Sequence, residues 1–174
     1  KKNYNIKSIL IIHNGKLGDM VCTTPLFIAI KKKNPNSKII LCGNKVNQEL
    51  MANESYIDKY IIFDKKNPKD LINSLKKEKL DFGILITPDF LGAYALFMSG
   101  VKFISVPKIL NGFSPYETIS YKIIRVLMNK VSHTMGNYAP REYLNFLLDI
   151  EMLKEDEINT EKKLSKKHLS LSTF

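Results

Sequence analysis

The sequence contains few residues of the kinds that build disulfide frameworks, phosphate clamps or membrane spans. Only two of its 174 residues, Cys22 and Cys42, are cysteines, so we predict two reduced thiols in the core and no disulfide. Arginine occurs only at Arg125 and Arg141, which makes bidentate phosphate clamps scarce. No apolar run approaches the roughly 18 residues that a membrane span needs. We therefore expect one ordinary globular domain without a membrane-spanning segment.

Signals for export and for metal binding are also missing. The lysines at Lys1 and Lys2 are followed by polar residues, and the first apolar run ends at His13, which is not the pattern of a signal peptide. No cysteine and histidine spacing fits a structural zinc site. We expect a cytoplasmic protein without a bound metal.

The charge of the chain is strongly positive. Its net charge is +10 at pH 7, which favours acidic partners such as nucleic acid, phosphorylated lipid headgroups or anionic sugars, unless the lysines only solubilise the surface. We find no nucleic-acid-binding motif and no interleaving of aromatic and basic residues, so nucleic acid is not an expected partner. Peripheral contact with the anionic inner face of the cytoplasmic membrane is the more economical alternative.

Short apolar segments alternate with helical patterns along most of the chain. Buried strands are predicted over residues 7–13, 38–42, 59–64, 81–87 and 102–106, the last ended by Pro107. Helices are predicted over residues 24–33, 45–53, 67–79, 90–99, 116–130 and 140–150, with a loop over 130–139. This alternation is typical of βαβ units and a parallel sheet, although the order of the strands cannot be read from it. We predict an α/β, Rossmann-like domain over residues 1–150 and a charged linker over 151–174.

The most informative stretch runs from Ile9 to Pro25. An apolar run suited to a buried parallel strand leads into a loop that contains Gly15 and Gly18, and Asp19 follows directly. Thr24 is the predicted N-cap of the next helix. The stretch therefore places a glycine loop, a carboxylate and a helix N-terminus together at the end of a strand.

That arrangement suits a binding site. Strand ends of open α/β sheets line ligand crevices, and glycines let a ligand approach the backbone closely. A helix N-terminus suits a phosphate, and the Asp19 carboxylate could accept a proton from a sugar hydroxyl. The alternative is a tight turn in which Asp19 is only a solvated cap. The glycines lack the dinucleotide-binding spacing, and Lys16 is not followed by Ser or Thr as in a P-loop.

Gly18-Asp19 followed by Thr23-Thr24-Pro25 resembles the opening of glycosyltransferase family 9, the ADP-heptose:lipopolysaccharide heptosyltransferases. Weaker similarities follow in the same order over Asn53–Ile61, Asp81–Val106 and His133–Leu148. The resemblance covers roughly residues 7 to 150.

The resemblance implies the N-terminal half of a GT-B glycosyltransferase. Residues 1–150 would hold a lipid-linked glycan acceptor, and residues 151–174 would lead towards an absent domain that binds the nucleotide-sugar. The activity implied is inverting transfer of a heptose or related sugar, with ADP-heptose as the expected donor and a lipopolysaccharide-type glycan as acceptor. The nucleotide-sugar is a co-substrate, and neither cofactor nor metal is expected. We expect the 174 residues alone to be inactive.

The same resemblance assigns residue roles. Asp19 takes the position of the general base, and Gly15 and Gly18 leave room for acceptor and donor phosphate. Thr23 and Thr24 would supply hydroxyl groups beside a helix N-terminus.

Three further residues are candidates for substrate binding. Lys16 could contact a phosphate or be a solvated loop lysine. Asp89 could touch a sugar hydroxyl, although a helix-cap carboxylate is the favoured interpretation. His133 is an acceptor-side candidate, whereas we expect His13 to be a packed structural histidine.

Two departures from the family pattern leave the acceptor open. The loop after the fourth strand lacks an arginine, and residues 104–107 do not have an Arg-Ile-Gly type of turn. The acceptor expected from the resemblance is therefore not restricted to a standard lipopolysaccharide inner core. Two other functions stay open, a non-catalytic module that binds a phosphorylated sugar or a partner protein, and an ordinary nucleotide-binding Rossmann domain.

Overall fold

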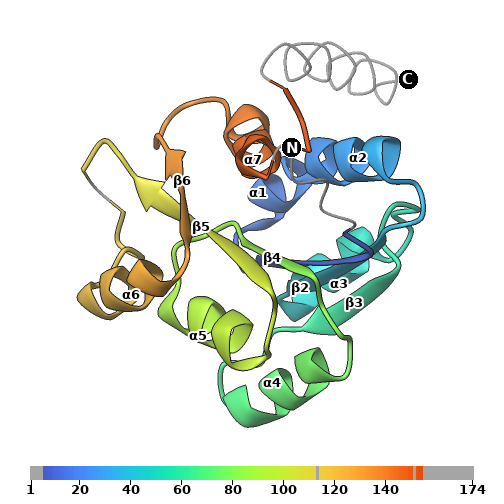
Figure 1. Ribbon diagram of the computed structural model, residues 1–174, viewed down its shortest axis with the longest axis horizontal. Coiled ribbons are helices and arrows are strands. Elements are labelled where there is room, and N and C mark those ends of the chain that lie inside the picture. Colours follow the sequence, from blue (N-terminus) through green and yellow to red (C-terminus); the bar gives the residue numbers. More distant parts are fainter. Residues whose placement is uncertain (1–5, 113, 151, 155–174) are drawn as a thin grey trace.

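A computed structural model describes residues 6–112, 114–150 and 152–154 as an α/β fold of three layers (Figure 1). Its six strands are β1 (Ser8–His13), β2 (Lys38–Gly43), β3 (Lys59–Ile62), β4 (Phe82–Leu85), β5 (Phe103–Ile109) and β6 (Asn129–His133). All neighbouring strands are parallel, in the order β3-β2-β1-β4-β5-β6. The Rossmann-like class predicted from the sequence is confirmed. The predicted linker lies outside the described residues except for 152–154.

Helices cover both faces of the sheet. They are α1 (Leu17–Val21), α2 (Thr24–Lys33), α3 (Lys45–Met51), α4 (Pro68–Lys76), α5 (Phe90–Met98), α6 (Ile119–Ile124) with the 3₁₀ helix η1 (Arg125–Leu127), and α7 (Ala139–Asp149). Residues of α1, α2, α3 and α7 join the core on one face, and residues of α4, α5 and α6 join the core on the other. Within the part of the chain that the structure describes, no helix has the length and apolarity to cross a membrane.

Strand β1 is the centre of both cores. Its six residues are all buried, and the side chains alternate between the faces, so that Ile9 and Ile11 pack on the α2 side while Leu10 and Ile12 pack on the α4–α5 side. A strand covered on both faces has no polar alternation, which is why the apolar run could be recognised. Cys22 and Cys42 are both free thiols; Cys42 is buried as predicted, whereas Cys22 is only partly buried against the core.

Three predictions about the helices are wrong. The glycine loop was expected to lead directly into α2, but residues Leu17–Val21 form the extra helix α1. Thr23 rather than Thr24 is the N-cap of α2. The helix expected over residues 116–130 is shorter, consisting of α6 and η1.

The end of β5 and the strand after it also differ from expectation. Pro107 lies within β5 instead of ending it. Because β4 pairs with β5 only as far as Ser105, Pro107 has a neighbouring strand on one side alone, where a missing N–H is tolerated. The segment predicted as a loop contains β6, which pairs with β5 from Ser105 to Ile109. Only Val131 of β6 is buried, so this edge strand has no apolar run.

The sheet has one point at which the order of the strands reverses. From β1 the chain moves outward through β2 to β3, and it then returns to place β4 on the other side of β1. Connections therefore leave the carboxyl ends of β1 and β4 in opposite directions and open a crevice between them. In this fold, that edge is the expected position of a ligand.

Candidate functional site

A cavity of about 450 Å³ lies at this carboxyl edge. Its walls come from the segments that follow β1, β3, β4 and β5, from the carboxyl end of β6, and from α7. The lining residues are His13, Asn14, Gly15, Lys16, Asp19, Lys65, Ile86, Thr87, Pro88, Asp89, Ser114, Tyr116, His133, Met135 and Tyr143. The topological switch point thus coincides with a hollow of small-ligand size.

Two asparagines hold the glycine loop in place. The carbonyl oxygen of Gly15 accepts hydrogen bonds from Nδ2 of Asn44 at 3.2 Å and Nδ2 of Asn47 at 3.0 Å. Asn44 is also the N-cap of α3, since its side chain accepts from the backbone N–H of Asn47 at 2.8 Å. The start of α3 therefore fixes the loop that forms one wall of the cavity.

Asp19 lies at the rim of the cavity on the first turn of α1. Its Oδ2 accepts a hydrogen bond from the backbone N–H of Lys16 at 3.2 Å, and the residue is exposed. Asp19 thus caps a short helix, and the residue also lines the cavity. A carboxylate has acceptor positions beyond the one used by Lys16, so a ligand hydroxyl can still bind it.

His13 forms the floor beside this carboxylate. The side chain is 1% exposed, and Oγ1 of Thr87 lies 3.3 Å from its Nδ1. Burial lowers the pKa of His13 to about 4, although the charge of Asp19 opposes that shift. The imidazole is therefore neutral at pH 7 and offers hydrogen bonds rather than a charge.

Tyr143 of α7 connects the two histidines of the cavity. The ring of His13 meets it edge-on with centroids 6.0 Å apart, and the ring of His133 stacks on it at 6.2 Å. Burial, and secondly the charge of Asp19, raises the pKa of the Tyr143 phenol. The phenol is thus protonated at neutral pH and can donate a hydrogen bond.

Several buried polar atoms of residues around this cavity make no hydrogen bond. Among the described residues, Nε2 of His13, both amide atoms of Asn14 and Nδ1 of His133 are buried without a hydrogen bond. Most buried polar side-chain atoms in proteins are bonded, so a cluster of exceptions calls for an explanation. All three residues line the same cavity, so these unbonded polar atoms lie just beneath its wall.

His133 stands at the carboxyl end of β6. Burial lowers its pKa, and the nearby carboxylate of Glu142 opposes that shift, with Oε2 at 3.7 Å from Nδ1. Glu142 also organises the following loop, because it accepts from the backbone N–H of Thr134 at 2.9 Å and from Nδ2 of Asn137 at 2.9 Å. Helix α7 thereby sets the position of His133.

The structure brings together five of the eight site residues predicted from the sequence. Asp19, Gly15, Lys16, Asp89 and His133 all line the cavity. Asp89 also has the favoured helix-cap role, since its Oδ2 accepts from the backbone N–H of Gly92 at 2.8 Å.

The other three predicted residues lie away from the cavity lining. Thr23 is fully buried, and its hydroxyl donates to the carbonyl oxygen of Met20 at 2.5 Å. Thr24 is the first residue of α2, whose N-terminus is separated from the glycine loop by α1. Gly18 lies within α1, and the space beside its Cα is open. The expected threonine hydroxyls and α2 N-terminus are therefore replaced at the cavity by Lys16 and the start of α1.

Sequence reasoning missed several lining residues. Asn14 directly precedes the first glycine, and Thr87 directly precedes Pro88, so both could have been found by listing polar residues at predicted strand ends. Tyr143 lies within the helix predicted over residues 140–150, where nothing in the local sequence sets it apart as a site residue. Lys65 and Tyr116 lie in loops, and Tyr116 was expected at the start of a helix instead.

Comparisons with known proteins agree with this architecture. No family model matches the sequence. A 106-residue segment, 59% of this chain, is 29% identical to a Haemophilus influenzae protein named "Putative glycosyltransferase". The match spans 31% of that relative's length, so the chain corresponds to a part of it.

Solved structures show the same fold. A glycosyltransferase of family 9 from Veillonella parvula superposes with a TM-score of 0.63 over 85% of this chain and 42% of its own, at 21% identity. The Escherichia coli heptosyltransferase WaaC, solved with ADP, has a TM-score of 0.64 over 82% of this chain and 46% of its own, at 13% identity. The fold is thus that of glycosyltransferase family 9 structures, and the resemblance predicted from the sequence is confirmed at that level.

Proposed function

We propose that this domain is the acceptor-binding half of an inverting glycosyltransferase and that Asp19 is its general base. The observation that carries the proposal is the carboxylate of Asp19 at the rim of a cavity whose floor contains unbonded polar atoms of His13 and Asn14. Sugars present many hydroxyl groups, which suit such a set of hydrogen-bonding atoms. The glycosyltransferase relative and the heptosyltransferase neighbours support the same class of reaction.

The proposed step is a single displacement. The Asp19 carboxylate accepts the proton of an acceptor hydroxyl, and that oxygen forms a bond to the anomeric carbon of the donor sugar. The bond between this carbon and the diphosphate oxygen breaks, so the nucleoside diphosphate leaves and the anomeric configuration inverts. ADP-heptose or a related nucleotide-sugar is the proposed donor, in keeping with the ADP bound by the Escherichia coli neighbour.

The remaining lining residues would orient the substrates. Lys16 and Lys65 place two cations on the wall of the cavity, where they would bind a phosphate of the donor or acceptor. The neutral imidazole of His13 and the protonated phenol of Tyr143 would hold sugar hydroxyls. We propose a lipid-linked, lipopolysaccharide-type glycan as the acceptor class and a cytoplasmic site of action.

Asp19→Asn tests the base in the two-domain protein that also carries the donor-binding half. The amide oxygen of asparagine can still accept from the N–H of Lys16, so the cap is kept while the basicity is lost. We expect kcat to fall by about 10²-fold or more, with the KM for acceptor nearly unchanged. Asp89→Asn, a second carboxylate on the same cavity, is the matched control and should change KM more than kcat.

An unchanged kcat in Asp19→Asn would remove the base role and favour a non-catalytic module that binds a phosphorylated sugar. Titration of the 174-residue chain with ADP tests the remaining alternative, that the chain is an ordinary nucleotide-binding domain. We expect negligible ADP binding, because the donor site would lie on the other domain.

A further inference from the structure

The helix α6 and the short helix η1 carry aliphatic side chains on the outside of the molecule. Ile119, Ile123, Val126 and Leu127 are between 66% and 78% exposed. Since successive members are four, three and one residues apart, they lie along one side of the helix. We refer to these four residues as the apolar stripe.

Residues on the inward side of the same helix form hydrogen bonds and an ion pair with the rest of the domain. Tyr121 is fully buried and its hydroxyl donates to the carbonyl oxygen of Pro107 at 2.7 Å. Arg125 donates to the same carbonyl oxygen at 3.4 Å and forms an ion pair with Glu117. An ordinary surface helix has the opposite arrangement, with apolar residues inside and polar residues outside. These inward bonds prevent α6 from rotating to hide the apolar stripe.

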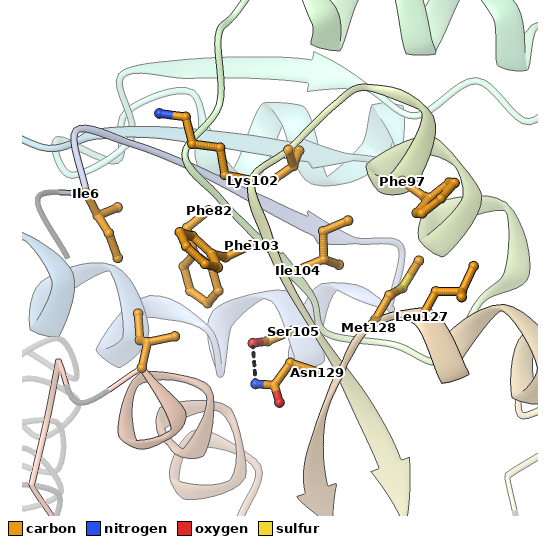
Figure 2. Close-up of a pocket in the computed structure, with 12 residues that line it drawn as sticks. Ile6, Phe82, Phe97, Lys102, Phe103, Ile104, Ser105, Leu127, Met128 and Asn129 are labelled. Atoms are coloured by element: carbon orange, nitrogen blue, oxygen red, sulfur yellow. Dashed lines mark hydrogen bonds between the residues drawn. The ribbon is translucent and has the colours of Figure 1, made fainter. Parts of the chain in front are cut away.

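The exposed apolar surface continues beyond the helix. Figure 2 shows Phe97 of α5 beside Leu127 and Met128, at one end of a hollow of about 490 Å³ at the amino edge of the sheet. Phe97 and Phe103, which both line this hollow, are each 46% exposed. Exposed apolar surfaces that extend over several elements mark interaction sites in soluble proteins.

Three exposed lysines lie on the same side of the sheet as α6 or on α6 itself. Lys122 lies on α6 itself, and Lys108 of β5 and Lys130 of β6 are exposed. The sheet register pairs Lys130 with Val106, whose side chain packs in the same core as Tyr121. By the alternation of side chains along a strand, Lys108 and Lys130 therefore project on the α6 side of the sheet.

We propose that the apolar stripe docks on an anionic lipid bilayer, with its aliphatic side chains at the boundary between headgroups and acyl chains. Lys108, Lys122 and Lys130 would contact the headgroups, because basic residues beside an apolar helix face favour anionic membrane surfaces. A second copy of the chain is the less suitable occupant, since two faces of this charge, on a protein of net charge +10, would repel each other.

The position of the apolar stripe connects it to the cavity at the carboxyl edge. Tyr116 lines that cavity, and the apolar stripe begins three residues later at Ile119. Docking would therefore bring the cavity close to the headgroup region, where the sugar of a lipid-linked acceptor is found. This consequence depends on the proposed function, whereas binding to lipid does not.

Vesicle flotation tests the proposal with the 174-residue chain. We expect it to float with vesicles rich in phosphatidylglycerol, to float poorly with pure phosphatidylcholine vesicles, and to dissociate as salt is raised. Ile119→Ser/Ile123→Ser should lower partitioning by at least ~tenfold. Val46→Ser/Leu50→Ser on α3 is the matched control, since these apolar residues are also exposed, and it should float like the parent chain.

A second pair of variants removes lysine charges and leaves the aliphatic side chains unchanged. Lys108→Gln/Lys130→Gln should reduce partitioning into vesicles by roughly fivefold per lysine. The control is Lys76→Gln/Lys77→Gln at the end of α4, which should have a smaller effect. All of these positions are exposed, and circular dichroism with the thermal midpoint checks that each variant is folded.

Absence of flotation with phosphatidylglycerol vesicles would overturn the proposal, as would equal flotation of the parent and Ile119→Ser/Ile123→Ser. A concentration-dependent dimer that this variant abolishes, without vesicle binding, would assign the surface to a second copy instead. Asp19→Asn should float normally, so loss of turnover in that variant and loss of lipid binding are separate results.

Discussion

The backbone of Gly15 packs directly against the imidazole ring of His13. A methyl group added to Gly15 would stand 2.6 Å from Cε1 of His13 and 3.1 Å from Cβ of Asp19. A side chain at this position therefore collides with the buried floor of the cavity and makes a tight contact with the proposed base. Close approach, rather than a left-handed backbone, is the reason for a glycine here.

Gly15→Ala should accordingly damage both stability and function. We expect the free energy of unfolding to fall by about 1–3 kcal/mol, as for other overpacked sites, and turnover of the two-domain protein to fall with it. Urea denaturation and steady-state kinetics measure the two effects. A fully stable and fully active variant would contradict the arrangement of Gly15, His13 and Asp19.

Gly18→Ala is the matched control for that substitution. Nothing lies within 4 Å of a Cβ built at Gly18, and the residue is inside α1. Alanine favours a helix more than glycine does, so we expect the free energy of unfolding to stay constant or rise by up to about 1 kcal/mol. A loss of binding or turnover in this variant would instead support the predicted contact of Gly18 with substrate.

The buried His13 predicts a specific pH dependence of stability. Its pKa is lowered from 6.5 to about 4 by burial, so the unfolded chain takes up this proton at a higher pH than the folded chain. The part of the free energy of unfolding that depends on His13 being neutral is fully present above pH 6.5 and is lost as the pH falls towards 4. At pH 5 this loss amounts to roughly 2 kcal/mol. Proton NMR should show the His13 titration with a midpoint near 4.

His13→Gln is the control for this dependence. The decrease in the free energy of unfolding between pH 7 and pH 5 should be smaller in the variant than in the parent chain. His133, whose pKa is also lowered by burial, contributes in the same direction in both proteins and cancels in the comparison. Equal pH dependence of the two proteins would show that His13 titrates normally.

Thr23→Val tests the reassignment of this threonine from ligand to structural residue. The substitution removes the hydroxyl that donates to the carbonyl oxygen of Met20 but keeps a similar volume. We expect a loss of about 1 kcal/mol in the free energy of unfolding and no change in acceptor KM. A raised KM with unchanged stability would restore the predicted role in substrate binding.

Glu142→Gln tests how α7 positions His133. A glutamine has one acceptor oxygen, so it cannot keep the bonds from both the N–H of Thr134 and the amide of Asn137. We expect a loss of about 1–2 kcal/mol in stability. The pKa of His133 should fall further, because the charge that opposes its lowering is removed. NMR titration of His133 in parent and variant measures this shift.

Much of the fold could be predicted from the sequence because burial on both faces leaves a strong local signal. The apolar run of β1, the alternation with helices and the Asp89 cap depend on neighbouring residues in the chain. Strand β6 could not be recognised in the same way, since an edge strand with one buried residue resembles a loop. Pro107 within β5 was misread because its tolerance depends on where β4 stops pairing.

The sequence by itself determined that a glycine loop, a carboxylate and a helix follow a buried strand, because these are consecutive residues with local preferences. Tertiary structure alone decided which of them meet. The strand order β3-β2-β1-β4-β5-β6 brings His133 of β6 and Tyr143 of α7 to His13 of β1, although more than a hundred residues separate them along the chain. It also removed Thr23 from the cavity and left the aliphatic face of α6 outside. Such contacts result from packing between distant segments, which no short stretch of sequence encodes.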